Sequence, residues 1–114
     1  EKAQVAIECS NTLVFFRGVT RVLFILFGIT HWSACIWFKV GKEGGATSWI
    51  AAHMPAGADL LTQYEYSLYF TLTTMTTVGY GDITPQNPDE VCFVSVLLVV
   101  ATVVFASLMG SLTD

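Results

Sequence analysis

Two long apolar runs dominate the pattern of hydrophobic and polar positions. The first extends from Val22 to Phe38, with His31 as its single ionisable side chain besides the thiol of Cys35, and residues 13–16 lengthen it upstream. The second runs from Val91 to Thr113 without a formal charge. About 20 apolar residues span the hydrocarbon core of a bilayer, where a helix satisfies its own backbone hydrogen bonds. The pattern therefore predicts two membrane-spanning helices.

A shorter helix is predicted between these runs. Thr62 and Glu65 form a T-x-x-E capping signature ahead of YSLYFTLTTM, so we expect a helix over residues 66–76. Such a helix is too short to cross a membrane, and a glycine-containing segment follows it. Irregular backbone is tolerated at membrane depth only where protein covers it or where it lines a water-filled path. The segment is therefore predicted to enter the membrane and turn back.

Capping signals mark the start of the second run. Asn87 is predicted to cap the helix, and Pro88 suits the first helical position. Asp89 and Glu90 lie where the helix dipole is positive. Asn87 together with Glu90 resembles a capping box, in which each side chain bonds to the backbone N–H of the other residue.

Composition supports a lipid environment. The 114 residues are 54% hydrophobic and only 12% charged, about half the charged fraction of a typical soluble domain. A net charge of −4 argues against a nucleic-acid partner. The three cysteines lack metal-ligand spacing and are predicted to be reduced, packed thiols. The chain begins without Met or a secretory signal, so we expect it to be part of a larger protein.

The segment TTMTTVGYGDITP, residues 73–85, has an unusual distribution of glycines. Gly79 and Gly81 reach positive φ at little steric cost, so successive carbonyls can face one direction. Four copies around an axis would form rings of oxygen ligands that replace the hydration shell of an ion. The Thr77 hydroxyl would add an inner ring, and Asp82 would place acid at the mouth. The alternative is a buried turn.

The same segment resembles the signature of tetrameric potassium channels. Three stretches, HWSACIWF (31–38), YSLYFTLTTMTTVGYG (66–81) and VFASLMGSLT (104–113), are similar to ether-à-go-go and cyclic-nucleotide-binding-domain channels. The resemblance implies an all-α membrane protein with two transmembrane helices, a re-entrant pore helix and a selectivity-filter loop in a tetrameric pore. The implied partners are K⁺, the bilayer and identical or related subunits. K⁺ is the permeant ion, and no cofactor, nucleic acid or catalysis is implied.

The resemblance also divides the chain into segments. The division comprises an interfacial linker helix (1–11), an outer helix (12–40), an extracellular turret (41–61), a pore helix (62–76), a filter (77–82), an outer loop (83–87) and an inner helix (88–114). Arg17 and Arg21 before the first run favour a cytoplasmic N-terminus, although Lys39 and Lys42 follow it. Acids on the outer side are expected to concentrate cations, namely Glu43, Asp59, Asp89 and Glu90.

Individual roles follow from the same resemblance. The ion-binding filter comprises Thr77, Val78, Gly79, Tyr80 and Gly81, with K⁺ held at the carbonyls of the first four. Filter support is assigned to Asp82, Tyr69 and Phe70. Tyr69 and Phe70 occupy the positions of a tryptophan pair in classical voltage-gated channels. The Tyr69 hydroxyl is expected to reach Asp82. The inner cavity is assigned to Thr76, Ala101, Phe105 and Met109, and Gly110 is a candidate hinge.

The chain departs from its subfamily in the filter. Ether-à-go-go channels typically carry phenylalanine at the position of Tyr80 and asparagine at that of Asp82, and hyperpolarisation-activated relatives replace Thr77 with cysteine. All three residues match strongly potassium-selective members. The expected function is potassium conduction by the pore of a voltage-gated or cyclic-nucleotide-linked six-helix subunit in the plasma membrane. The alternatives are a complete two-helix or weakly selective cation channel, and a non-conducting membrane subunit.

Other notable residues have structural interpretations. His31 is expected to be neutral and bonded to a carbonyl or hydroxyl, and Trp32 and Trp37 to serve packing or interface anchoring. Trp49 and His53 are expected to pack at the surface of the outer loop, with proton or toxin binding as the alternative. Glu65 is interpreted as a capping acid.

Overall fold

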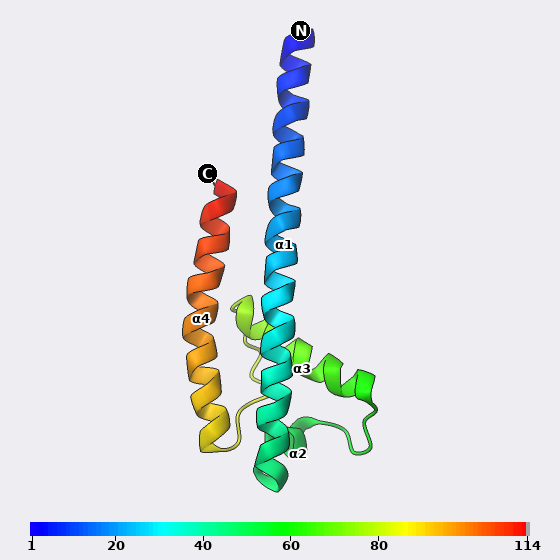
Figure 1. Cartoon of the computed structure of the whole chain (residues 1–114), viewed down its shortest axis with the longest axis vertical. Helices are drawn as coiled ribbons and strands as arrows, with labels where there is room; N and C mark the ends of the chain where they lie inside the picture. The colour runs from blue at the N-terminus through cyan, green and yellow to red at the C-terminus, as the bar shows by residue number, and fades with distance from the viewer. Residues whose placement is uncertain (114) are drawn as a thin grey trace.

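A computed structural model describes residues 1–113 and consists of helices joined by short loops. These are α1 (Lys2–Gly44), the 3₁₀ turn η1 (Gly45–Thr47), α2 (Trp49–His53), α3 (Leu60–Met75) and α4 (Pro88–Thr113). The long helices α1 and α4 run side by side in opposite directions, and α3 crosses beside the lower half of α1 (Figure 1). Two long apolar helices with a short helix between them confirm the predicted fold class.

The helix α1 is continuous over 43 residues. No break separates residues 1–11 from residues 12–40, although the sequence had predicted two elements there. The stretch holds no proline that would interrupt the helix. The helix also extends past residue 40, to Gly44.

The helix α3 begins earlier than the capping signature predicted. Its N-cap is Asp59, whose Oδ1 accepts a hydrogen bond from the Thr62 backbone N–H at 3.0 Å. Hydrogen bonding to Thr62 also lowers the pKa of the exposed Asp59 carboxyl. Thr62 therefore lies inside the helix, and the assignment of Thr62 and Glu65 as a capping pair is wrong. At 16 residues, roughly 24 Å, α3 is still too short to cross a bilayer.

The start of α4 confirms half of the predicted capping box. Asn87 Oδ1 accepts from the Glu90 N–H at 2.9 Å, and Pro88 is the first helical residue. The Glu90 side chain does not return a bond to Asn87. Its carboxylate instead accepts from the backbone N–H groups of Trp49 and Gln86.

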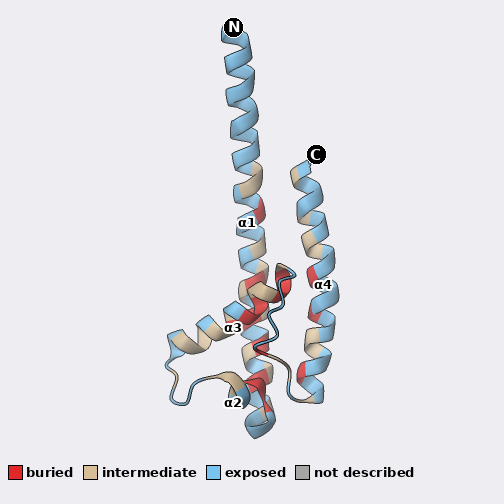
Figure 2. Ribbon diagram, turned by 180° about the vertical axis from the view of Figure 1, so that it is seen from behind, coloured by how far each residue is buried: buried red, intermediate tan, exposed pale blue. Residues whose placement is uncertain are grey.

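An aromatic core lies where all four α-helices meet. The Trp37 ring stacks on Trp49, Phe70 and Phe93 at centroid distances of 5.0, 4.4 and 5.9 Å. Met75, Ile83, Leu97 and Ala101 complete the buried cluster. Buried residues concentrate around α2 and α3, whereas the N-terminal half of α1 is almost entirely exposed (Figure 2).

Gly41 allows α1 and α2 to approach closely. A Cβ at this position would collide with the Trp49 ring and would lie 2.8 Å from Ile50 Cδ1. This approach lets Trp49 Nε1 donate to the Trp37 carbonyl at 3.1 Å. The Trp37 Nε1, by contrast, is buried without a partner among the described residues.

Two helices of the described chain are long and apolar enough to cross a membrane. They are α1, taken with η1, and α4, whose most apolar 18-residue windows have mean hydropathies of 1.8 and 2.8. Only 6% and 11% of their most apolar windows are buried within the chain. A helix in the core of a soluble protein would bury most of such a window, so these surfaces require lipid or another protein to cover them.

Candidate functional site

The segment Thr77–Asp82 leaves the end of α3 and is exposed in the single chain (Figure 1). Thr77, Gly79 and Gly81 have positive φ, at 64°, 55° and 76°, whereas Val78 and Tyr80 do not. This alternation is compatible with successive carbonyls facing one side, which an extended strand does not allow. The glycine spacing had predicted two of the three positions. Thr77 was missed because threonine carries no signal for positive φ.

The first backbone N–H groups of this segment donate to carbonyls in the last turn of α3. Val78 N–H and Gly79 N–H both donate to the Thr73 carbonyl, at 2.9 and 3.1 Å, and Thr77 N–H donates to the Thr74 carbonyl at 3.2 Å. Among residues 1–113, no backbone N–H donates to a carbonyl of residues 77–81. The segment therefore exposes a short row of carbonyl oxygens that accept no backbone hydrogen bond. The N–H groups of its first three residues are already bonded to carbonyls of α3.

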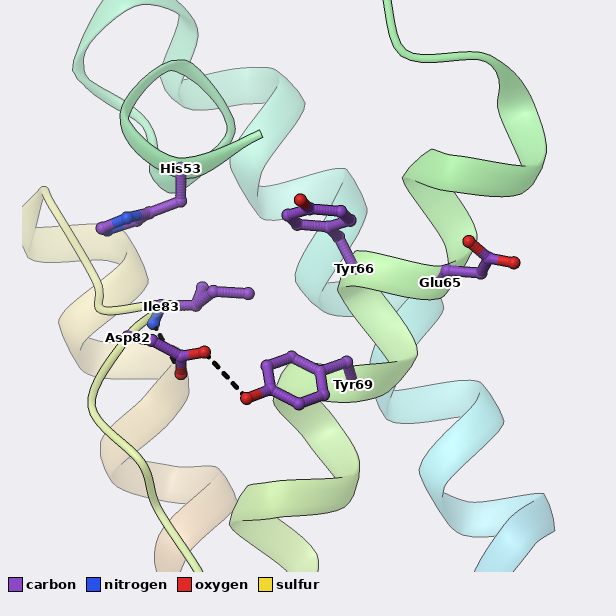
Figure 3. Close-up of a pocket in the computed structure, with 6 residues that line it drawn as sticks. All are labelled: His53, Glu65, Tyr66, Tyr69, Asp82 and Ile83. Carbon is purple, nitrogen blue, oxygen red and sulfur yellow. Dashed lines mark hydrogen bonds between the residues drawn. The ribbon is translucent and has the colours of Figure 1, made fainter. Parts of the chain in front are cut away.

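A hydrogen bond holds the outer end of the segment to α3. The Tyr69 hydroxyl donates to Asp82 Oδ2 at 2.8 Å, as the sequence had predicted, and Asp82 Oδ1 accepts from the Ile83 N–H at 3.1 Å (Figure 3). The bond from Tyr69 lowers the pKa of Asp82, and the bond to Asp82 raises the pKa of Tyr69. The Tyr69 and Tyr80 rings lie nearly parallel at 6.4 Å. The other proposed support residue, Phe70, is buried against Trp37.

His53 lies across a groove from this bond (Figure 3). Its Nε2 is 3.3 Å from the Thr84 hydroxyl and 3.2 Å from Gln86 Nε2. The groove has a volume of about 470 Å³ and is also lined by Tyr69 and Asp82. His53 therefore joins α2 to the loop after the exposed segment, a contact that the sequence did not reveal.

Glu90 is buried, with 0% of its surface exposed. Its carboxylate accepts from Trp49 N–H at 2.9 and 3.1 Å and from Gln86 N–H at 2.9 Å. The prediction that Glu90 adds an exposed charge at the mouth is therefore wrong. Its partners are backbone groups, which leave no signal in the sequence. Glu43, Asp59 and Asp89, the other acids of that prediction, are exposed.

The residues proposed for an inner cavity differ in burial. Ala101 is 2% exposed and belongs to the chain's own core, whereas Met109 is 38% exposed and Phe105 is half-buried. Thr76 caps the C-terminal end of α3. A Cβ at Gly110 would meet no atom within 4 Å, so no close contact in the single chain requires a glycine there.

Several interpretations of single residues can be compared with the contacts. His31 Nδ1 lies 2.6 Å from the Tyr64 hydroxyl, which confirms a hydroxyl partner. Trp37 is fully buried, whereas Trp32 is 73% exposed in the single chain. Trp49 is fully buried in the core, so the prediction that it packs at the surface is wrong. The cysteines Cys9, Cys35 and Cys92 are free, as predicted, but exposed in the single chain, so their predicted packing is wrong.

Comparison with known proteins places the chain in a family. The family described as Ion channel matches residues 45–114. Human cyclic nucleotide-gated channel alpha-3 is 37% identical over 84% of this chain and 14% of its own length. Rat voltage-gated delayed rectifier potassium channel KCNH1 is 26% identical, and human KCNH5, of the same description, 29%, each over 96% of this chain and 14% of its own length.

The chain thus spans about a seventh of these relatives. Two candidate membrane spans together with this homology make it an integral membrane protein. The family match covers η1, α2, α3, the exposed segment and α4, which is more than half of the chain. The chain belongs to the ion channel family, carries a pore domain related to cyclic nucleotide-gated and KCNH channels, and is not an enzyme.

Proposed function

We propose that this chain forms the pore of a potassium-selective channel and that residues 77–82 are its filter. The observation that carries the proposal is the row of free carbonyls at alternating φ. In such a filter the carbonyl oxygens of Thr77, Val78, Gly79 and Tyr80 replace the water around a dehydrated K⁺ ion. Gly81 permits the backbone to leave the row, and the Thr77 hydroxyl supplies an inner oxygen ring.

The filter requires several copies of the chain. One chain supplies a single wall, and the exposed segment has no protein opposite it. Val78 and Tyr80 are 52% and 70% exposed, which is costly for apolar side chains next to a permeation path. Four copies around an axis close the rings and cover these side chains. We therefore propose a tetramer of identical or related subunits.

The inner side of the filter fits cation passage. The C-terminal end of α3 at Thr76 carries partial negative charge, and four such ends aimed at one cavity stabilise a cation there. Thr76, Phe105 and Met109 are proposed to line that cavity, and Gly110 to allow the inner helix to bend. We keep the proposed order of turret, pore helix, filter, outer loop and inner helix, with the turret following the end of α1 at Gly44 and the pore helix beginning at Leu60.

A reversal potential measured in mixed K⁺ and Na⁺ tests the filter. The full-length protein, reconstituted in vesicles, should reverse close to the K⁺ equilibrium potential. Gly79→Ala should remove selectivity or conduction, because a Cβ at its φ of 55° costs about 1 kcal/mol or more in each copy. Gly57→Ala is the matched control, since Gly57 has φ of 72° and equally open surroundings outside the filter. Equal effects of Gly79→Ala and Gly57→Ala on selectivity would contradict the assignment of residues 77–82 as the filter.

A weakly selective cation channel is the second candidate. The 37% identity to cyclic nucleotide-gated channel alpha-3 favours it. A wild-type reversal potential near zero in opposing K⁺ and Na⁺ gradients would select this alternative. Absence of any flux, with protein of tetrameric size present, would select a non-conducting subunit. We propose a plasma-membrane location and a six-helix subunit whose remaining helices lie outside the printed sequence.

A further inference from the structure

One ring nitrogen of His53 meets three polar groups from the loop after the exposed segment. The backbone N–H of Thr84 donates to His53 Nε2 at 3.4 Å, and the Thr84 hydroxyl oxygen is 3.3 Å from the same atom. The side-chain nitrogen of Gln86 lies 3.2 Å away. Each contact is long and therefore weak alone, but together they fasten the loop to α2.

The neighbours of this nitrogen define its protonation state. The direction of the Thr84 N–H is set by the backbone, and the amide nitrogen of Gln86 can only donate. The Thr84 hydroxyl already accepts from Gln86 Nε2 at 2.8 Å, so its own hydrogen is free to point to the ring. All three contacts are satisfied only when Nε2 carries no hydrogen. The arrangement therefore requires the neutral ring with its hydrogen on Nδ1.

A proton added to Nε2 reverses this arrangement. The new N–H would face the N–H of Thr84 and the amide hydrogens of Gln86, so donors would oppose a donor and the contacts would break. Histidine is the side chain whose ordinary change of charge falls between about pH 5 and 8. Mild acid on this side of the membrane is therefore enough to change the contact.

The groove beside His53 offers the charged ring another partner (Figure 3). Its other titratable lining residues are Glu65, Tyr66, Tyr69 and Asp82. The pKa of Asp82 is lowered chiefly by the bond from Tyr69 and also by the nearby His53. Asp82 accepts from the Tyr69 hydroxyl and from the Ile83 N–H, which leaves acceptor sites on its carboxylate for a third donor. An imidazolium can therefore bind Asp82 without displacing Tyr69.

The loop keeps a second attachment when the first is lost. The Gln86 backbone N–H donates to Glu90 Oε2 at 2.9 Å, and Glu90 is fully buried. This bond does not involve His53. Loss of the imidazole contacts therefore frees the backbone of Thr84, while the end of the loop stays fastened to α4.

We propose that His53 is a proton-operated switch on the loop of residues 84–86. The neutral ring holds this loop to α2, and the protonated ring releases it and turns across the groove to Asp82. The switch rests on the contacts of His53 and not on the proposed potassium selectivity. Because the loop directly follows residues 77–82, acid removes one of the attachments that hold the outer end of that segment.

Hydrogen exchange of single amides tests the switch without any measurement of current. The full-length protein in lipid vesicles is exchanged at about pH 8 and about pH 5.5, and each rate is divided by the intrinsic rate at that pH. We expect protection of the Thr84 amide to fall roughly threefold to tenfold in acid, as for loss of one or two weak hydrogen bonds. The Gln86 amide is the internal control and should stay protected. Loss of protection at both amides, or at neither, overturns the proposal.

The variant H53Q is matched to this experiment, because glutamine keeps an acceptor at this position and does not titrate. Protection of the Thr84 amide should then be the same at both pH values. A loss in acid equal to that of wild type would identify another group as the sensor and overturn the proposal. H53A removes the acceptor and should leave Thr84 equally unprotected at both pH values, and retained protection would contradict the contact itself.

A second pair of variants tests where the charged ring goes. D82N removes the carboxylate that receives the imidazolium and should shift the midpoint of Thr84 release to lower pH. E65Q removes the other carboxylate of the same groove and should shift the midpoint less. An unchanged midpoint in D82N, or a larger shift in E65Q, contradicts the movement of His53 towards Asp82.

Discussion

The two ends of this chain are built on different principles. The end that carries the candidate filter is called the outer end, and the end with the N-terminus of α1 is called the inner end, after the proposed orientation. At the outer end, Trp37, Trp49 and Phe70 stack in a buried core, and Glu90 ties α4 to α2. At the inner end, the N-terminal half of α1 and the end of α4 leave almost all their side chains exposed. The contacts within the chain are therefore concentrated around the candidate filter and hold it in place. Lipid or another protein must cover the rest.

Truncating one phenylalanine at each end gives the largest expected contrast. Phe70→Ala should lower the free energy of unfolding by about 3–5 kcal/mol, because Phe70 is 7% exposed and stacked on Trp37. Phe24→Ala makes the same chemical change at an 81% exposed position and should cost less than about 0.5 kcal/mol. Detergent titration of the purified protein, followed by circular dichroism, measures both. Comparable losses would refute the division into two ends.

Removing the buried carboxylate should have the next largest effect. Glu90→Ala leaves the buried N–H of Trp49 and the partly buried N–H of Gln86 without their acceptor, at a cost on the order of 3 kcal/mol. Asp89→Ala, at the exposed neighbouring position, is the control and should be close to neutral. The same unfolding titration applies. If both variants unfold at the same detergent fraction as wild type, Glu90 does not fasten the outer end.

A smaller difference should separate the two stacked tryptophans. Trp49→Phe deletes the donor to the Trp37 carbonyl, whereas Trp37→Phe removes an N–H that has no partner among the described residues. Both variants lose similar ring volume, so Trp49→Phe should be about 1 kcal/mol the more destabilising. Unfolding free energies of the two proteins give the comparison directly. The reverse order would mean that the Trp37 N–H is engaged in the assembled channel.

The subtlest expected effect concerns pH at the brace between Tyr69 and Asp82. The pKa of Asp82 is lowered and that of Tyr69 raised, chiefly by their mutual hydrogen bond. Stability from Asp82 is present above the ordinary aspartate pKa and is lost as pH falls through the lowered value. Stability from Tyr69 is present below the ordinary tyrosine pKa and is lost as pH rises through the raised value. The brace should therefore be intact between roughly pH 5 and 9.

The variant Tyr69→Phe tests this brace. Without the phenol, the pKa of Asp82 should return towards its ordinary value. Any decline of current at low external pH should then begin at a higher pH than in wild type. Currents recorded during stepwise acidification measure the midpoint. Identical midpoints would show that the bond does not govern the outer end of the filter.

The sequence predicted features that depend on long patterns or on side chains close in the chain. The two apolar runs predicted α1 and α4, and the position of Asn87 before the second run predicted that it caps α4. The Tyr69–Asp82 bond followed from the resemblance to known channels. Local competition was harder to resolve: Asp59 and Thr62 are both good capping residues, and the helix begins after the first of them.

Features that depend on tertiary partners were not predictable. From the sequence, Glu90 looks like an exposed acid in the first turn of a helix. Its burial could not be predicted, because its partners are backbone N–H groups of residues 49 and 86. The identity of Thr77 likewise gave no sign of its positive φ. This conformation accompanies the hydrogen bonds that the N–H groups of residues 77–79 donate to the carbonyls of Thr73 and Thr74. The burial of Ala101 arises from the packing of α4 on the chain's own core.

The attachment of Glu90 also sets how α4 can move. Sliding α4 along its axis would break the bonds from Trp49 and Gln86 together and would strand a charge in the core. Tilting α4 about its first turn breaks none of these bonds, although its far end lies close to α1, with Leu112 beside Gly18. We therefore expect the first turn of α4 to stay fixed relative to α2 and the carbonyl row, and any change in tilt to displace the more distant turns of α4 most.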